Sequence, residues 1–425
     1  MKINSINNTN FKGYDARHLK GFLMNSNNGG IATEMLNIGR KEGFEIYSVT
    51  KNSCKRNVIS PQKEIIGIWA QDFWTILEKS LLFKNFNDLT QIILKKFKVS
   101  PNEFQEKIRK TPECIKLIQD VIVKQFEIEE YFNSGDYDIE ILKEKGIELK
   151  SKYHSMHKGL ATKHIPGGNI FITLGEKGNE LLVGEDELQE FTPDEIMNLY
   201  SVNKITIIPQ MDYHLDLFIR PLNNMRVLLT DDNLSLKVFE KAINKLQHYT
   251  KLHNNIDYLI KDNYLDLIEF YNNFKNNIKE NKNPQTDAIE KILRDSGYEV
   301  IRVPGRIYET HSLQNNTSSI LRHRCNYINA NCLLNKKNEL VYITNKSNID
   351  DDLLSLVFKI TGVSFENEFA KAISPFIKKE HLYFIEGNDS YVSEEMLWYA
   401  MGGIHCACSE IPLDIGENYD QSSTS

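Results

Sequence analysis

The residues best suited to chemistry lie near the end of the chain, where residues 402–405 read Gly-Gly-Ile-His and directly precede Cys406. Cysteine attacks carbon as the thiolate, so a nucleophilic cysteine needs surroundings that favour negative charge, and two glycines allow close backbone approach beside it. Free cysteines are more often small buried apolar residues, so the stretch is also compatible with core packing. Cys406 is the candidate nucleophile, and Cys408 is a rival thiol.

A histidine and two carboxylates could assist such a nucleophile. His214 and Asp216 stand two positions apart in the stretch 213–219, which we predict to be a strand with both polar side chains on one face. A paired imidazole and carboxylate can orient each other and bind a cation, although a polar pair on the solvent face of a strand would have the same pattern. Asp72 follows the predicted strand 65–70, where it could be a functional carboxylate or a helix N-cap.

Two further glycines precede a predicted hairpin. Gly167 and Gly168 lead into strand 170–174, and residues 180–184 are its expected partner. The pair lacks the spacing of either common phosphate-binding loop. We therefore expect a turn here, or a place where the backbone approaches a ligand closely.

The elements that must position these residues alternate between helix and strand. Strands are predicted at 43–49, 204–209, 225–230, 298–303, 327–334, 340–344 and 381–385, and helices at 29–40, 286–296, 351–361 and 393–399. Charged amphipathic runs interrupt this pattern at 75–163, which we predict to be a helical insertion, and at 235–283, which we predict to be a second helical insertion or an elongated crossover. Residues 1–74 and 164–415 then form one α/β catalytic domain, followed by a disordered tail at 416–425.

Composition narrows the class of protein. The 425 residues, 41% of them apolar, suffice for a large core, and the formal net charge of −7 argues against nucleic-acid binding and suits a cationic substrate. No signal-peptide pattern and no run of about 18 apolar residues occurs, so we expect a cytoplasmic protein without membrane contact, with export by another route left open. Six scattered cysteines indicate reduced thiols, with neither a disulfide framework nor a structural zinc site.

The order of four motifs resembles the guanidino-group modifying superfamily, which includes peptidylarginine, agmatine and arginine deiminases and amidinotransferases. The motifs are Trp69-x-x-Asp72, Gly167-Gly168-Asn169, His214-x-Asp216 and Gly402-Gly403-x-His405-Cys406. The resemblance covers most of the chain outside 75–163 and 235–283. It implies a pentein fold, a ring of five ββαβ modules around a central tunnel, which would make this chain a five-module α/β propeller with helical insertions.

The resemblance also implies roles for individual residues. It makes Cys406 the nucleophile, His214 the acid/base, and Asp72 and Asp216 the carboxylates that bind the guanidinium. It further places Gly168 and Asn169 against the substrate. It implies no metal and no organic cofactor.

Departures from the family patterns leave three functions open. Gln71 and Pro166 stand where agmatine deiminases tend to have Arg and an acidic residue, so the chain is more similar to peptidylarginine deiminases. The run 220–222, Arg-Pro-Leu, is similar to amidinotransferases. The first function is a deiminase that acts on an arginine derivative, with protein arginine favoured over a small guanidino compound and a protein partner expected at the helical insertions. The others are an amidinotransferase and a non-catalytic binding module.

Overall fold

The computed structural model divides the chain into two compact units, one of residues 1–50 and 167–425 and the other of residues 51–166. The residues whose structure is described are 16–25, 29–49, 58–59, 64–66, 143–147, 150–151, 167–175, 178–189, 191–252, 258–280, 285–312, 319–346, 361–386, 403–405 and 408–413. Within these ranges the fold is mixed α/β, as the sequence predicts.

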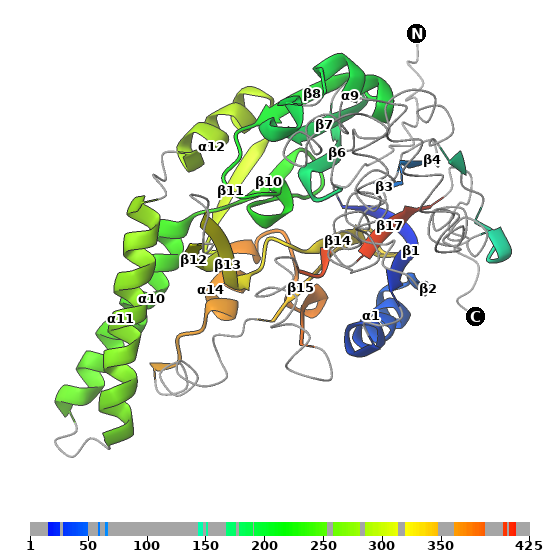
Figure 1. Cartoon of the computed structure of the whole chain (residues 1–425). Coiled ribbons are helices and arrows are strands. Elements are labelled where there is room, and N and C mark those ends of the chain that lie inside the picture. Colours follow the sequence, from blue (N-terminus) through cyan, green and yellow to red (C-terminus); the bar gives the residue numbers. More distant parts are fainter. Residues whose placement is uncertain are drawn as a thin grey trace, which may run out of the picture. The chain divides into compact units, whose positions relative to one another are not determined.

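A hairpin followed by a helix and a parallel strand is the repeating motif of the first unit. Its clearest example consists of β6 (Ile170–Gly175), β7 (Gly178–Gly184), α9 (Pro193–Tyr200) and β8 (Lys204–Ile208). β6 pairs antiparallel with β7, and β8 returns parallel to β7 after the helix (Figure 1). Leu181, Leu182 and Val183 on the central strand are all fully buried, as expected where both faces of a strand are covered.

The same pairing occurs three more times in this unit. The strands are β9 (Ile219–Pro221), β10 (Arg226–Thr230) and β11 (Glu299–Val303); β14 (Asn331–Leu334), β15 (Leu340–Asn345) and β16 (Leu382–Ile385); and β17 (Cys408–Pro412), β1 (Arg17–Asn25) and β2 (Glu45–Val49). In each group the first two strands are antiparallel and the third is parallel to the second. The connections to the third strand contain α10 (Asp232–Leu252), α11 (Tyr258–Glu280) and α12 (Gln285–Asp295); α14 (Phe365–Ile373); and α1 (Gly29–Glu42).

The second unit contains one more group of this kind. β3 (Val58–Ile59) pairs antiparallel with β4 (Glu64–Ile66), and β5 (Lys150–Ser151) is parallel to β4. β5 lies inside residues 75–163, which we predicted to be helical, and most of that region is outside the described residues. The group of an antiparallel pair with a third strand parallel to its second member therefore occurs five times among the described residues, and β1 also pairs parallel with β14, which joins two of the groups into one six-stranded sheet.

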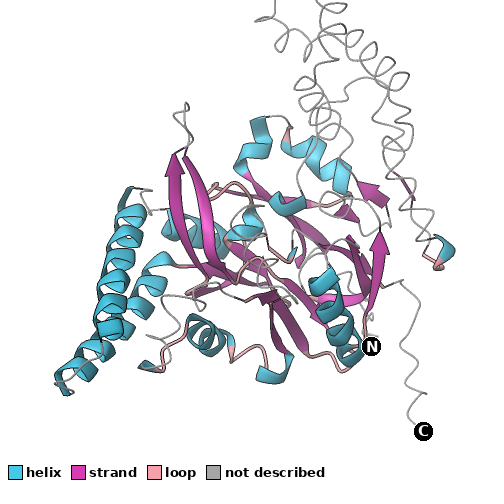
Figure 2. Ribbon diagram, turned by 60° about the horizontal axis from the view of Figure 1, so that its bottom comes forward, coloured by secondary structure: helices cyan, strands magenta, loops and turns pink. Residues whose placement is uncertain are grey.

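Two further features of the first unit accompany the repeated strand pairing. β12 (Arg306–Ser312) and β13 (Ser319–Asn326) form a long two-stranded ribbon, which stands out in Figure 2. The region 235–283 forms the hairpin of α10 and α11, whose helices lie side by side in Figure 1. This hairpin contributes to the largest hydrophobic core, because Phe239 on α10 and Phe274 on α11 are buried against each other.

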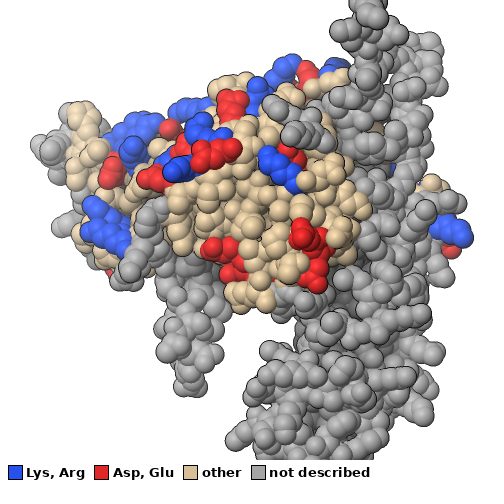
Figure 3. All heavy atoms as spheres, turned by 90° about the horizontal axis from the view of Figure 1, so that it is seen from above, with Lys and Arg blue, Asp and Glu red and all other residues tan. Residues whose placement is uncertain are grey.

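The surface of the described residues carries both signs of charge. On the face drawn in Figure 3, Lys and Arg side chains are interspersed with Asp and Glu side chains. Among the described helices, none combines the length and the apolar content that crossing a bilayer requires. Nor do three or more His, Cys, Asp or Glu side chains gather into a group suited to a metal ion anywhere in the described ranges.

Candidate active site

Three of the four sequence motifs meet in the first unit. Gly168 lies in a short 3-10 turn, η2 (Gly167–Asn169), directly before β6. A Cβ atom on Gly168 would lie 2.8 Å from His214 Nδ1 and 2.9 Å from Asp216 Oδ2. His214 and Asp216 therefore both approach the same glycine, although they are far from it in sequence.

The predicted strand over 213–219 is wrong. His214 is extended, but Leu215–Leu217 form a 3-10 turn, η4, and β9 begins only at Ile219. The physical reason is twofold: the N–H of Leu215 donates to Asn169 Oδ1 at 3.1 Å instead of to a neighbouring strand, and the N–H groups of Leu217 and Phe218 donate within the turn, to the carbonyl oxygens of His214 and Leu215. His214 and Asp216 still come together, through the turn and not through strand alternation.

Asn169 anchors the segment that carries the histidine. Its Oδ1 atom accepts hydrogen bonds from the N–H of Leu215 and from Gln210 Nε2, at 3.1 and 2.9 Å. Its Nδ2 atom donates to Glu187 Oε1 at 2.6 Å. Because the side chain is only 1% exposed, these bonds fix residues 210–215 firmly against η2.

The third motif contacts the other two through the side chain of His405. Its Nδ1 atom lies 2.8 Å from Asp216 Oδ2, and both side chains are buried. The ring of His405 also contacts the ring of Phe171 on β6, with centroids 5.5 Å apart. The residue directly before Cys406 is therefore bound to the candidate guanidinium-binding carboxylate.

The electrostatic surroundings of His214 favour a neutral imidazole. Burial lowers the pKa of His214 below its ordinary value, and the negative charges of Asp216 and Asp212 only partly oppose this effect. The nearby imidazole of His405 lowers the pKa of His214 further. A neutral imidazole can accept a proton from a thiol or from water near neutral pH.

A buried arginine holds the segment before His214. Arg306, at the start of β12, donates to Asp212 Oδ2 at 2.8 Å and to both carboxylate oxygens of Asp232 at 3.0 and 3.1 Å. Tyr308 donates to Asp232 as well. Burial alone would lower the pKa of Arg306, but the charges of Asp232 and Asp212 raise it above its ordinary value, so the guanidinium stays charged.

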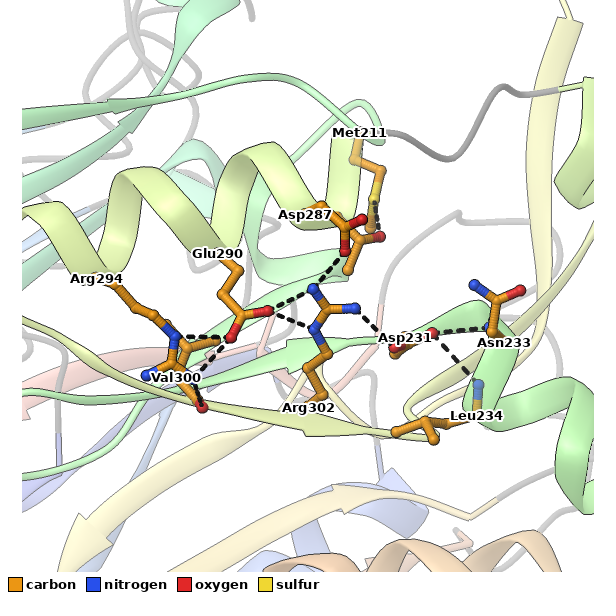
Figure 4. Close-up of polar contacts among 10 residues, drawn as sticks. Met211, Asp231, Asn233, Leu234, Asp287, Glu290, Arg294, Val300 and Arg302 are labelled. Atoms are coloured by element: carbon orange, nitrogen blue, oxygen red, sulfur yellow. Dashed lines mark hydrogen bonds and ion pairs between the residues drawn. The ribbon is translucent and has the colours of Figure 1, made fainter.

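A second arginine, Arg302, lies among several acidic side chains and is partly exposed (Figure 4). Arg302 on β11 contacts Asp231, Asp287 and Glu290, and thereby connects the strand to α12 and to the start of α10. Asp231 caps that start, because its Oδ1 accepts the N–H of Asn233 at 2.9 Å.

Two buried asparagines bind the backbone directly before Cys406. Asn345 Oδ1 accepts the N–H of Ile404, and Asn329 Oδ1 accepts the N–H of His405, both at 3.0 Å. A Cβ atom on Gly403 would lie 2.2 Å from Asn345 Nδ2. Only glycine fits at this position without displacing the asparagine.

Glu410, four positions after Cys406 in the sequence, belongs to a buried cluster of opposite charges. Glu410 on β17 contacts Arg220 on β9 at 3.0 Å and Arg17 on β1 at 3.7 Å. Arg220 is fully buried, and its guanidinium carbon lies 5.4 Å from the centre of the Phe171 ring. The strand that follows His214 is thus linked to the strand that follows Cys406.

The remaining candidate residues lie outside the described residues. These are Asp72 with the rest of its motif, and Cys406 itself. Cys408, the rival thiol, is buried in β17. Cys325 and Cys332 are also buried.

Sequence reasoning did not assign roles to several residues that the structure brings to the site. His405 was part of a motif but received no function, and Asp212 precedes His214 by only two positions. The close spacing of Asn326, Asn329 and Asn331 is a weaker signal, because asparagine is common throughout the chain. Arg306 gave none, because its contact with Asp212 depends on long-range folding.

No protein-family model matches the chain, and no curated protein matches it. Among solved structures, the chain is similar to the agmatine deiminase of C. jejuni, with 15% sequence identity and a TM-score of 0.35. The match covers 68% of this chain and 65% of that protein, so the chain spans just under two thirds of its length.

Proposed function

We propose that the protein is a hydrolase that deiminates the guanidinium of an arginine derivative, with Cys406 as nucleophile and His214 as acid/base. The observation that carries the proposal is the meeting of three motifs, in which Asp216 lies against Gly168 beside His214 and binds His405. The fivefold strand pairing supports it too, because the resemblance in sequence implied five ββαβ modules.

The chemistry fits the described side chains. A guanidinium is planar and cationic, so carboxylates such as Asp216, together with Asp72, would hold it by charge-assisted hydrogen bonds with its carbon against the sulfur. His214, neutral in the resting protein, accepts the thiol proton, and the Cys406 thiolate attacks the central carbon. The tetrahedral intermediate then loses ammonia as the C–N bond breaks and His214 returns the proton, which leaves a thiouronium on Cys406.

The second half of the reaction uses the same histidine. His214 accepts a proton from water as the water oxygen attacks the thiouronium carbon. The C–S bond then breaks, and the products are a ureido compound and free thiolate. Gly168 and Asn169 line the substrate position in this scheme. We favour an arginine within a protein as the substrate, with a protein partner at the predicted insertions, residues 75–163 and 235–283.

Acyl transfer, the other common reaction of nucleophilic cysteines, fits the site less well. Acyl-transfer enzymes need N–H donors near the nucleophile to stabilise an oxyanion. The N–H groups of Ile404 and His405 are already bound by asparagine side chains. Around Asp216 the side chains offer negative charge, which attracts a cation.

The test compares the protein with its Cys406→Ala and Cys408→Ala variants on free arginine, agmatine and an arginine-rich protein. We expect ammonia release and a gain of about 1 Da on one substrate class, lost in Cys406→Ala and retained in Cys408→Ala. A parallel assay adds glycine and other amines as acceptors. If the amidino group is transferred to an amine, the protein is an amidinotransferase and not a hydrolase. If no substrate reacts and no adduct forms on Cys406, the protein is a non-catalytic binding module.

A further inference from the structure

We propose that Asn329 and Asn345 are positioning residues that fix the backbone before Cys406 and so set the thiol against the carbon it attacks. This inference rests on the proposed function. Each asparagine accepts one of two consecutive backbone N–H groups, those of Ile404 and His405. Two adjacent peptide units held by separate side chains cannot rotate independently, so the backbone of Ile404 and His405 is held in one conformation.

The fit around this segment is close. A Cβ atom on Gly403 would lie 2.2 Å from Asn345 Nδ2 and 2.7 Å from Asn329 Oδ1. The backbone of Gly403 therefore lies directly against both amides. All three residues are buried, so water does not compete for these hydrogen bonds.

A third asparagine, Asn326, forms hydrogen bonds with both Asn345 and Asn329. Asn345 Nδ2 donates to the carbonyl oxygens of Asn326 and Asn329, at 3.3 and 3.0 Å. Asn326 Oδ1 accepts the N–H groups of Ile328 and Asn329, both at 3.0 Å, which closes the loop between β13 and β14. The loop is therefore a rigid support and not a flexible linker.

The same loop binds the segment that carries Asp216. Asn326 Nδ2 donates to the carbonyl oxygen of Leu217 at 3.0 Å. One buried loop thus contacts the backbone next to Asp216 and the backbone next to Cys406. The asparagines would set the position of the nucleophile relative to the carboxylate, which is the geometry that decides the rate of attack.

The test uses Asn345→Ala and Asn329→Ala, with Asn335→Ala as the matched control. Asn335 is also buried, and its Oδ1 accepts the backbone N–H groups of Lys337 and Glu339. It lies in the turn between β14 and β15. We expect kcat to fall by about 10- to 100-fold in the two site variants, with KM changed by less than about threefold. The control should lose stability and keep its kcat.

A second readout separates this inference from the proposed function. Cys406 is alkylated with chloroacetamidine, a planar cation, and with neutral chloroacetamide, and the ratio of the two rates is measured. The wild-type protein should prefer the amidine reagent, and Asn345→Ala should lose that preference. Where Asn345→Ala does not fold, Asn345→Asp, which keeps an oxygen for the N–H of Ile404, takes its place and should show a smaller loss.

The outcomes are distinguishable. An active wild-type protein whose site variants keep full kcat and the amidine preference would overturn the positioning role and leave the proposed function intact. Equal loss of kcat in Asn335→Ala would also overturn it, because any buried asparagine would then have the same effect. A wild-type protein with neither deimination nor amidine preference would overturn the proposed function itself.

Discussion

At the scale of single residues, Gly168 is the glycine that lies against both His214 and Asp216. Its missing side chain leaves room for both His214 and Asp216, and a methyl group would come within 2.8 to 3.0 Å of three of their polar atoms. Neither neighbour can easily move away. Asp216 is bound to His405, and His214 is followed directly by the anchored Leu215.

We therefore expect Gly168→Ala to lower kcat/KM by about 100-fold, since small displacements of reacting groups have effects of that size. Gly175→Ala is the control, at the other end of β6, where a Cβ atom would meet the side chain of Glu180 at 2.0 Å. The control should lower the urea midpoint while kcat stays unchanged. Steady-state kinetics and urea unfolding of both variants measure this, and a fully active Gly168→Ala would remove the glycine from the site.

The sequence predicted correctly that His214 and Asp216 lie together, but it predicted the wrong backbone structure for them. Strand alternation grouped His214 with Asp216, and the structure groups them by a 3-10 turn. The turn depends on Asn169, a residue far away in sequence, whose side chain binds the N–H of Leu215. Such a bond has no signature in local periodicity, so the geometry of the pair could not be derived from residues 213–219 alone.

At the scale of elements, two arginines with several acidic partners contribute to stability in different ways. Arg302 on β11 is 30% exposed and contacts three carboxylates, and Arg306 on β12 is 2% exposed and contacts two. Exposed ion pairs contribute little because water and salt screen them. Removing one partner of a buried pair leaves an uncompensated charge in the interior.

We expect Arg306→Met to reduce the free energy of unfolding by about 3–5 kcal/mol. Arg302→Gln should cost about 1 kcal/mol or less, although it removes more contacts. Denaturant unfolding of both variants at low and high salt gives the comparison, and only the small Arg302 effect should shrink further with salt. Equal losses would mean that the number of contacts, and not burial, decides the contribution.

The elements themselves were partly predictable. The hairpin of β6 and β7, the strands β8, β10 and β11 and the helix α12 lie close to where apolar patterns and turn residues predicted them. The ribbon of β12 and β13 was missed, because its sequence is rich in polar and charged residues. The strand β17 was missed because five residues directly after a glycine-rich motif carry too short a pattern to recognise.

At the scale of the whole molecule, the repeated strand pairing was invisible in the sequence. Each module is built from short apolar strands, and the connections range from the single helix α9 to the three helices between β10 and β11. One module also joins β17, near the C-terminus, to β1, near the N-terminus. A repeat with such unequal spacing and one circularly shifted member has no fixed period to detect.

The unequal length of the connections also matters for residues 235–283, which lie in the connection between β10 and β11. As an insertion on the surface, this segment would be dispensable for folding, but α10 and α11 supply much of the largest core. Phe239 on α10 is fully buried and contacts three other rings, with centroid distances of 5.4 Å to Phe270, 6.0 Å to Phe274 and 4.8 Å to Phe365. The last of these rings belongs to α14, in a different module.

We therefore expect Phe239→Ala to lower the free energy of unfolding by about 3–5 kcal/mol, the usual cost of removing a buried aromatic ring. Leu265→Ala is the matched control, because Leu265 lies on α11 of the same hairpin but is 57% exposed, and it should change stability by less than about 0.5 kcal/mol. Because Phe365 links the hairpin to α14, the loss should appear in the cooperative unfolding of the first unit. A separate early transition confined to the hairpin, with the main transition unchanged, would instead show that residues 235–283 fold as an independent insertion.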